Sequence, residues 1–269
     1  MTILLSVKKR IEIPNSLFMS QSLEDVTLIG PTRYYAQPEI KSSLDLPSLT
    51  TLHLENVILN HENPGEYGGI FSKCLNLKNL TLSNCNINDH TPFISYPEFS
   101  KLTPEKGLYS FANVVVPHLK NLTVVDCRGP IKIYAPELSS LMYQVPYYDT
   151  FFANGLSCLE KVDFYMCPFE EDDAPIMKIL EQFHTVKYLT LGLEVVELLD
   201  LYVDMLSNLP SPFANLTSLK IYPWKKEGKK KLMVHRQVKN FLLGASSNAT
   251  VSIYSRKQVK ALKDATSAQ

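Results

Sequence analysis

Apolar residues recur along this chain in the spacing L-x-x-L-x-L. Clear copies occupy residues 49–54, 77–82, 119–124 and 159–164, and weaker copies start at Leu23, Leu138, Val186 and Leu216. The second half of each copy alternates apolar and polar residues, as a β-strand does when one of its faces is buried. In the first clear copy we expect Leu52 and Leu54 to point into the core and His53 to point outward. The pattern predicts eight strands, each of which needs neighbours to cover its apolar side.

The distances between these copies indicate a repeat architecture. Successive copies start 26, 28, 42, 19, 21, 27 and 30 residues apart, and leucine-rich repeats have about 20–29 residues. We therefore predict an α/β fold, a curved leucine-rich-repeat solenoid with a parallel sheet on its concave side and helices and irregular segments on its convex side. The longest interval predicts an insertion, and its prolines and glycine indicate a long loop over about residues 88–117.

Helical periodicity occupies some of the intervals between strands. Apolar residues follow the i, i+3, i+4 spacing in residues 176–183 and again along 195–209, which predicts a helix in each. The intervals after residues 119 and 138 are too short for a strand and a helix, so we expect an extended or irregular return there.

The repeat pattern stops after residue 222. We expect the solenoid to occupy residues 1–222 and a C-terminal cap to occupy residues 223–269, because the last apolar face of a solenoid must be covered. Within the cap the pattern predicts a helix over 234–243, a strand over 249–254 and a short basic helix over 256–263.

The chain has five cysteines, an odd number that favours reduced thiols over a disulfide framework. Cys85, Cys127 and Cys167 share one phase of the repeat, just past the strand, where a small polar side chain can satisfy backbone groups. We expect Cys74 and Cys158 to be buried near the starts of repeats. No C-x-x-C pair of the kind that binds zinc is present.

Other chemistry is sparse in this sequence. No phosphate-binding loop, nucleophile elbow or zinc-protease motif occurs, and the six histidines are scattered. We therefore predict no catalytic residues, no metal site, no cofactor and no enzymatic activity. The acidic residues 170–173 precede a predicted helix, whose N-terminus they would stabilise through its dipole.

Charge and hydropathy limit the partners. Lysine plus arginine and aspartate plus glutamate both total 27, whereas a protein that binds nucleic acid usually has a basic excess. No apolar run approaches the roughly 20 residues that span a membrane, and the N-terminus does not resemble a secretion signal. We therefore expect an intracellular protein, in cytoplasm or nucleus, that binds neither nucleic acid nor membranes.

The outward positions of the strands form the best candidate surface. Successive strands of a repeat protein present one extended array on the concave face, where such proteins commonly bind partners. Tyrosine is enriched at interfaces because it buries a large area and keeps a polar group. We predict that the partner-binding residues are His53, Lys161, Asp163, Tyr165, Tyr188, Lys220 and Tyr222.

Several phrases resemble the plant F-box/leucine-rich-repeat proteins of the FBD type. Residues 11–18 and 22–23 are similar to the family's entry into a repeat, and residues 46–54 (LPSLTTLHL) and 71–80 are similar to its next repeats. Residues 238–250, with the phrase NFLLGASSNAT, resemble the FBD segment that closes these chains. The likeness spans nearly the whole chain.

This resemblance implies a substrate receptor of an SCF-type ubiquitin ligase. In the family, the F-box binds a Skp-type adaptor on a cullin scaffold, and the repeats hold a target protein. We find no F-box in these residues, so we expect either a fragment or an F-box-less relative, and adaptor and cullin are expected partners only if an F-box lies upstream. The alternative is a leucine-rich-repeat scaffold or ligand sensor that acts by binding alone.

Overall fold

The computed structural model describes residues 1–4, 13, 15–60, 70–88, 112–129, 131–145, 151–166, 175–223, 234–244, 246, 248–255 and 258. The chain falls into two compact units: unit 1 is Met1–Leu138 with Asp149–Ser157, and unit 2 is Ser139–Tyr148 with Cys158–Gln269. The fold is mixed α/β, with a large parallel sheet of ten strands. Within the described part of the chain, no helix has the length and apolar character needed to cross a membrane.

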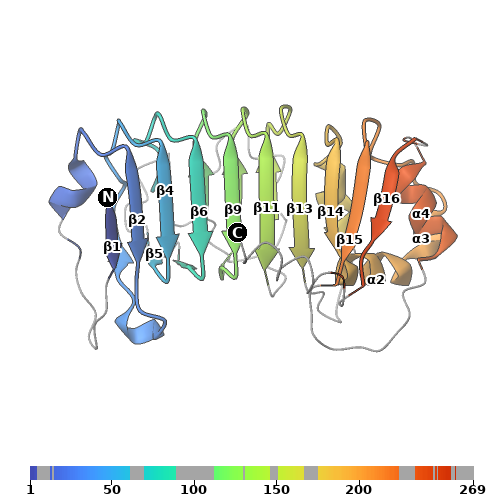
Figure 1. Cartoon of the computed structure of the whole chain (residues 1–269), viewed down its shortest axis with the longest axis horizontal. Coiled ribbons are helices and arrows are strands. Elements are labelled where there is room, and N and C mark those ends of the chain that lie inside the picture. Colours follow the sequence, from blue (N-terminus) through green and yellow to red (C-terminus); the bar gives the residue numbers. More distant parts are fainter. Residues whose placement is uncertain are drawn as a thin grey trace, which may run out of the picture. The chain divides into compact units, whose positions relative to one another are not determined.

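The sheet strands of unit 1 follow the leucine spacing. Their order is β1 (Thr2–Leu4), β2 (Asp25–Ile29), β4 (Thr51–Glu55), β6 (Asn79–Ser83) and β9 (Asn121–Val125), all parallel (Figure 1). Equivalent leucines are register partners, so that Leu28 lies beside Leu54 and Leu54 beside Leu82. All three are fully buried, while the residues just before them on the opposite face are half-buried. The predicted strand alternation is confirmed.

The return segments of unit 1 are extended. β3 (Glu39–Ile40), β5 (Ile58–Asn60) and β7 (Asn86–Asn88) form one three-stranded sheet, and β8 (Ala112–Val115), β10 (Ile131–Tyr134) and β12 (Phe151–Asn154) form another. The described residues of unit 1 include the 3-10 helices η1 (Asn15–Met19) and η2 (Tyr34–Ala36) but no α-helix. After β4 and β6 the chain turns within two residues and then forms a second strand, so the described returns of this unit are strands and 3-10 helices.

The loop predicted over residues 88–117 is corrected at both ends. Asn88 is the last residue of β7, and Ala112–Val115 is β8, which pairs with β10. The residues from 112 to 116 read Ala-Asn-Val-Val-Val, and runs of valine favour a strand. The part of the predicted loop between 89 and 111 lies outside the described residues.

Unit 2 contributes the other five strands of the parallel sheet. Their order is β11 (Ser140–Val145), β13 (Lys161–Met166), β14 (Tyr188–Gly192), β15 (Ser218–Tyr222) and β16 (Thr250–Ile253). Their apolar side carries a ring cluster: Phe164 stacks on Tyr143 with ring centroids 5.7 Å apart and meets Phe183 edge-on at 5.6 Å. The extended returns predicted for the short intervals are confirmed by β10 and β12.

The described α-helices all belong to unit 2. They are α1 (Pro175–Glu181), α2 (Leu193–Leu201), α3 (Val203–Leu206) and α4 (Arg236–Leu243) (Figure 1). These confirm the helices predicted in 176–183 and 234–243, but the segment 195–209 holds two helices with a break at Tyr202 (φ −109°, ψ 25°). The strand predicted in 249–254 is β16. The acidic residues 170–173 and nearly all of the helix predicted over 256–263 lie outside the described residues.

A further buried position completes each repeat. The residue three places before the first leucine of a copy accepts a backbone hydrogen bond from that leucine, as Leu46 does from Leu49 and Cys74 from Leu77. This position is buried in every copy from the second onward: Leu46, Cys74, Val116, Ala135, Leu156, Phe183 and Phe213. Cys74 is buried as predicted, but Cys158 is exposed because Leu156 fills this position in its repeat.

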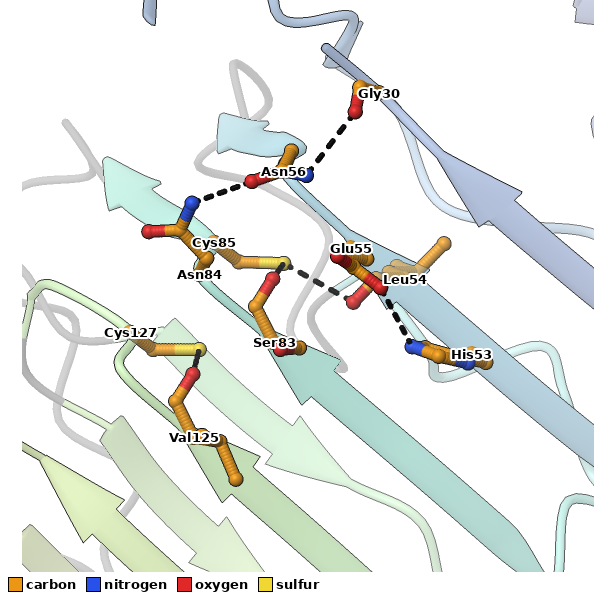
Figure 2. A network of polar contacts seen from close by, with 10 residues as sticks. All are labelled: Gly30, His53, Leu54, Glu55, Asn56, Ser83, Asn84, Cys85, Val125 and Cys127. Atoms are coloured by element: carbon orange, nitrogen blue, oxygen red, sulfur yellow. Dashed lines mark hydrogen bonds and ion pairs between the residues drawn. The ribbon is translucent and has the colours of Figure 1, made fainter. Parts of the chain in front are cut away.

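Asparagine and aspartate make the turn after three sheet strands of unit 1. Asn56, Asn84 and Asp126 have φ values of 55°, 49° and 52°, in the left-handed region that asparagine and aspartate enter more readily than other residues with side chains. The side-chain amide of Asn56 donates to the carbonyl of Gly30 at 3.1 Å and accepts a hydrogen bond from the amide of Asn84 (Figure 2). These two hydrogen bonds link the turns that follow β2, β4 and β6.

The cysteines follow this turn. The thiol of Cys85 donates to the carbonyls of Leu54 and Ser83, each at 3.4 Å, and that of Cys127 to the carbonyl of Val125 at 3.5 Å (Figure 2). A hydrogen bond with Cys85, together with burial, raises the pKa of Cys127 well above the ordinary value. These contacts match the structural role predicted for both thiols, whereas Cys167 lies outside the described residues.

Candidate partner-binding surface

Six of the seven predicted site residues come together on one face of unit 2. β13 carries Lys161, Asp163 and Tyr165; β14 carries Tyr188; and β15 carries Lys220 and Tyr222. Lys161 is the register partner of Tyr188. Asp163 is the register partner of Thr190 on the intervening strand β14, and Thr190 is in turn the register partner of Lys220. Alternation places all six on the face opposite the leucines. His53 belongs to unit 1, on β4, where its Nε2 lies 3.7 Å from a carboxylate oxygen of Glu55.

A tyrosine that the sequence reasoning omitted completes this face. Tyr254 follows β16 directly and donates its backbone N–H to the carbonyl of Ile221 at 3.0 Å. Its ring stacks on that of Tyr222, with centroids 4.3 Å apart and an angle of 3° between the planes. We call Tyr165, Tyr222 and Tyr254 the tyrosine cluster. All three are half-buried, so each ring keeps a surface that a partner can cover.

The ring of Tyr165 has room beside Gly192 because glycine has no side chain. A Cβ at Gly192 would lie 3.4 Å from Cδ1 of Tyr165 and 3.3 Å from Oε2 of Glu194. Both distances are at the lower limit for ordinary contacts, so a side chain at this position would crowd the ring. Gly192 precedes helix α2, and Glu194, in the first turn of that helix, is a buried carboxylate beside the cluster.

Two phenols of the tyrosine cluster, those of Tyr165 and Tyr222, are electrically neutral at physiological pH. Burial, followed by the nearby charge of Asp163, raises the pKa of Tyr165 well above its ordinary value. Burial and a hydrogen bond with Tyr254 raise the pKa of Tyr222 to about 12. The phenols of Tyr165 and Tyr222 therefore keep their protons and offer hydrogen-bond donors and acceptors together with apolar ring surface.

Charged pairs lie on the same face of unit 2, toward the starts of the strands. The Nζ of Lys161 lies 3.3 Å from a carboxylate oxygen of Asp163 on the same strand. At the start of the next strand, Lys187 pairs with Glu160 at 2.7 Å, a contact that raises the pKa of Lys187. Exposed ion pairs of this kind contribute little to stability, because water and salt screen them. These pairs place both signs of charge on one side of the tyrosine rings, which lie toward the ends of the same strands.

The missing tyrosine had a signal in the sequence. Residues 249–254 were predicted as a strand, and Tyr254 stands four positions after Thr250, as Tyr222 stands four positions after Ser218. Extending the outward array by one more strand would have included it. The parts played by Gly192 and Glu194 had no such signal, because they depend on how helix α2 begins beside the ring of Tyr165.

Among the described residues, no group of three or more histidine, cysteine, aspartate or glutamate side chains is placed to hold a metal ion. The six predicted site residues on this face supply phenols, amines and one carboxylate, and that carboxylate lies 3.3 Å from the Nζ of Lys161. The chain matches no protein-family model, no curated protein and no solved structure.

Proposed function

We propose that this chain is a protein-binding module of the leucine-rich-repeat type, and that the tyrosine cluster of unit 2 is the centre of its partner surface. The observation that carries the proposal is the parallel stack of Tyr222 on Tyr254 beside Tyr165, on the outward face of the sheet. Aromatic side chains at the centre of an interface contribute most of its binding free energy. A stacked pair is also fixed before binding, so little side-chain entropy is lost when a partner covers it.

The surroundings of the cluster fit a protein partner. Protein interfaces have an apolar centre and a polar rim in which mixed charges set orientation. Here the neutral rings supply the centre, and Lys161, Asp163 and Lys220 supply the rim. Tyr188, 52% exposed on β14, adds a further aromatic contact. The partner we expect is a folded protein or peptide that presents an apolar or aromatic side chain flanked by polar groups.

A finer proposal follows from the sequence resemblance. Resemblance to the F-box/leucine-rich-repeat proteins of the FBD type supports a role in target recognition for an SCF-type ubiquitin ligase. In that case the tyrosine cluster holds the target protein, and a Skp-type adaptor and a cullin are partners only if an F-box lies upstream of these residues. The alternative is a repeat scaffold or sensor that binds the same partner without a ligase.

Affinity capture from a plant-cell extract, read by mass spectrometry, tests the proposal. The test variant replaces all three residues of the cluster, as Tyr165→Ala, Tyr222→Ala and Tyr254→Ala. The matched control replaces two exposed tyrosines of unit 1, as Tyr34→Ala and Tyr35→Ala. We expect the captured partner to bind the test variant at least about tenfold more weakly and the control variant as it binds the natural chain, with circular dichroism spectra unchanged in both.

The outcomes separate the coarse proposal from the fine one. A partner that binds the test variant and the natural chain equally well contradicts the placement of the surface. Recovery of an adaptor and a cullin together with the target supports the ligase role. A target that is lost only in the test variant, without adaptor or cullin, supports a chain that acts by binding alone, either as a fragment without its F-box or as a repeat scaffold.

A further inference from the structure

Strand β16 forms an open edge of unit 2. It pairs in parallel with β15, from Ser218 beside Thr250 to Ile221 beside Ile253, and no described strand pairs with its other side. An exposed edge strand presents a row of backbone donors and acceptors that can pair with another chain. Natural proteins usually protect such an edge with charges, a proline or a bulge.

The backbone groups on the free side can be assigned from the hydrogen bonds on the paired side. Thr250 donates to the carbonyl of Thr217 at 2.9 Å, and Tyr254 donates to that of Ile221 at 3.0 Å. Residues that bond to one neighbour alternate along a parallel strand with residues that face the other way. The N–H and C=O groups of Val251 and Ile253 therefore point to the open edge.

The side chains of the same two residues are uncovered. By register, Val251 continues the buried row of Leu219, and Ile253 continues that of Ile221. Leu219 and Ile221 are each 2% exposed, whereas Val251 is 39% and Ile253 50% exposed. The strand reads Thr-Val-Ser-Ile, with no charge and no proline. The strand therefore carries neither the charge nor the proline that protects many edge strands.

We propose that β16 pairs with β16 of a second copy of this chain, antiparallel and centred on Ser252. With the two-fold axis at Ser252, Val251 lies opposite Ile253 of the second copy. The two residues exchange both of their backbone hydrogen bonds, and symmetry repeats the exchange, so the pairing forms four bonds. Val251 and Ile253 also meet across the strands and cover each other. This proposal goes beyond partner binding and does not depend on it.

Self-complementarity and charge favour a second copy as the occupant. The outward-pointing groups, one donor and one acceptor on each of Val251 and Ile253, match their own arrangement after a two-fold rotation, which an isologous interface requires. No charged side chain lies on the strand to repel its copy, and the chain as a whole has a net charge of zero. The paired area is small, so we expect a weak dimer, with a dissociation constant on the order of tens of micromolar.

Analytical ultracentrifugation over a concentration series is the first test. Val251→Pro removes an N–H that faces the open edge and leaves the bonds to β15 in place, because proline is tolerated where the N–H faces outward. Val251→Ala is the matched control, which trims the side chain and keeps the N–H. We expect the proline variant to weaken the dimer about tenfold or more, since two bonds are lost for each dimer, and the alanine variant to weaken it less.

Disulfide crosslinking tests the register without disturbing the backbone. In a Cys158→Ser background, Ser252→Cys places two thiols opposite each other across the two-fold axis, about 4.5 Å apart at Cα as in a pair without mutual hydrogen bonds. Thr250→Cys is the control, because in this register Thr250 lies opposite Tyr254 of the second copy. We expect a covalent dimer from the first variant under mild oxidation and none from the second.

Three results would overturn the proposal. One is a natural chain that stays monomeric up to several hundred micromolar, which would mean that the edge is covered within its own chain. Another is growth beyond the dimer, which would indicate pairing of β16 with a different edge. The last is equal crosslinking of the two cysteine variants, which would exclude a register centred on Ser252.

Discussion

The turn residue Asn56 provides the sharpest test of how the repeats of unit 1 are linked. It is 3% exposed, it has φ 55°, and its side chain bridges the carbonyl of Gly30 and the amide of Asn84 (Figure 2). Replacing it with alanine removes both side-chain hydrogen bonds and places an ordinary Cβ in the left-handed region. Replacing it with glycine removes the same bonds without the backbone strain.

The expected changes in the free energy of unfolding follow from the lost hydrogen bonds and from the backbone strain. Asn56→Gly loses two hydrogen bonds, one buried and one part-buried, at about 1 kcal/mol each. The greater freedom of glycine in the unfolded chain costs this variant about a further 0.4–1 kcal/mol, so we expect its free energy of unfolding to fall by about 2.5 kcal/mol. Asn56→Ala loses the same two bonds, and alanine in the left-handed region costs about a further 1–2 kcal/mol. We therefore expect Asn56→Ala to be less stable than the natural chain by about 3.5 kcal/mol and less stable than Asn56→Gly by about 1 kcal/mol.

Urea unfolding followed by circular dichroism measures both differences. Asn76→Ala is the matched control, since Asn76 also donates to a backbone carbonyl, that of Pro47 at 2.7 Å, but is exposed. We expect the control to lose no more than about 1 kcal/mol. If Asn56→Ala lost as little as the control, the linking role of the amide would be refuted. If the alanine and glycine variants were equally stable, the argument from backbone conformation would fail.

Two further predictions concern titration and reactivity. Because the pKa of Tyr222 is raised from 10 to about 12, the folded state holds this proton more tightly; the resulting stabilisation is complete below pH 10 and is lost as pH rises through about 12. Tyr254→Phe removes one cause of the shift, so ultraviolet absorbance at alkaline pH should show Tyr222 ionising at lower pH in this variant, and an unchanged titration would contradict the hydrogen bond between the two phenols. In the folded protein, iodoacetamide should modify Cys158, which is exposed, far faster than Cys74, whose pKa burial raises to about 11. Mass spectrometry of the alkylated peptides would decide, and rapid modification of Cys74 would contradict its burial.

The sheet strands could be predicted from the sequence because their signal is local. The leucine spacing places one face of each strand in the core, and all eight copies that it identified correspond to strands in the structure. The second strands of the repeats could not be predicted in the same way. β5 and β7 have only three residues each, and a three-residue segment has too few positions to show an alternation of period two.

The candidate surface could be predicted only in part. Strand parity placed Tyr165, Tyr188 and Tyr222 on one face, which is a property of each strand alone. The stack of Tyr254 on Tyr222 depends on β16 lying beside β15, a contact between segments 32 positions apart in the register. The same limit explains Cys158, since its exposure depends on which residue fills the buried position three places before the repeat.

The register of unit 1 has a consequence for how such a chain can change in evolution. Asp25 aligns with Thr51 across 26 residues, whereas Asn79 aligns with Asn121 across 42. Both pairs belong to the same sheet with the same alternation of buried and outward side chains. Residues can therefore be gained or lost between two strands while every outward side chain keeps its neighbours. The length of the connections and the residues of the outward face can be selected independently, so new recognition properties can arise on one without redesign of the other.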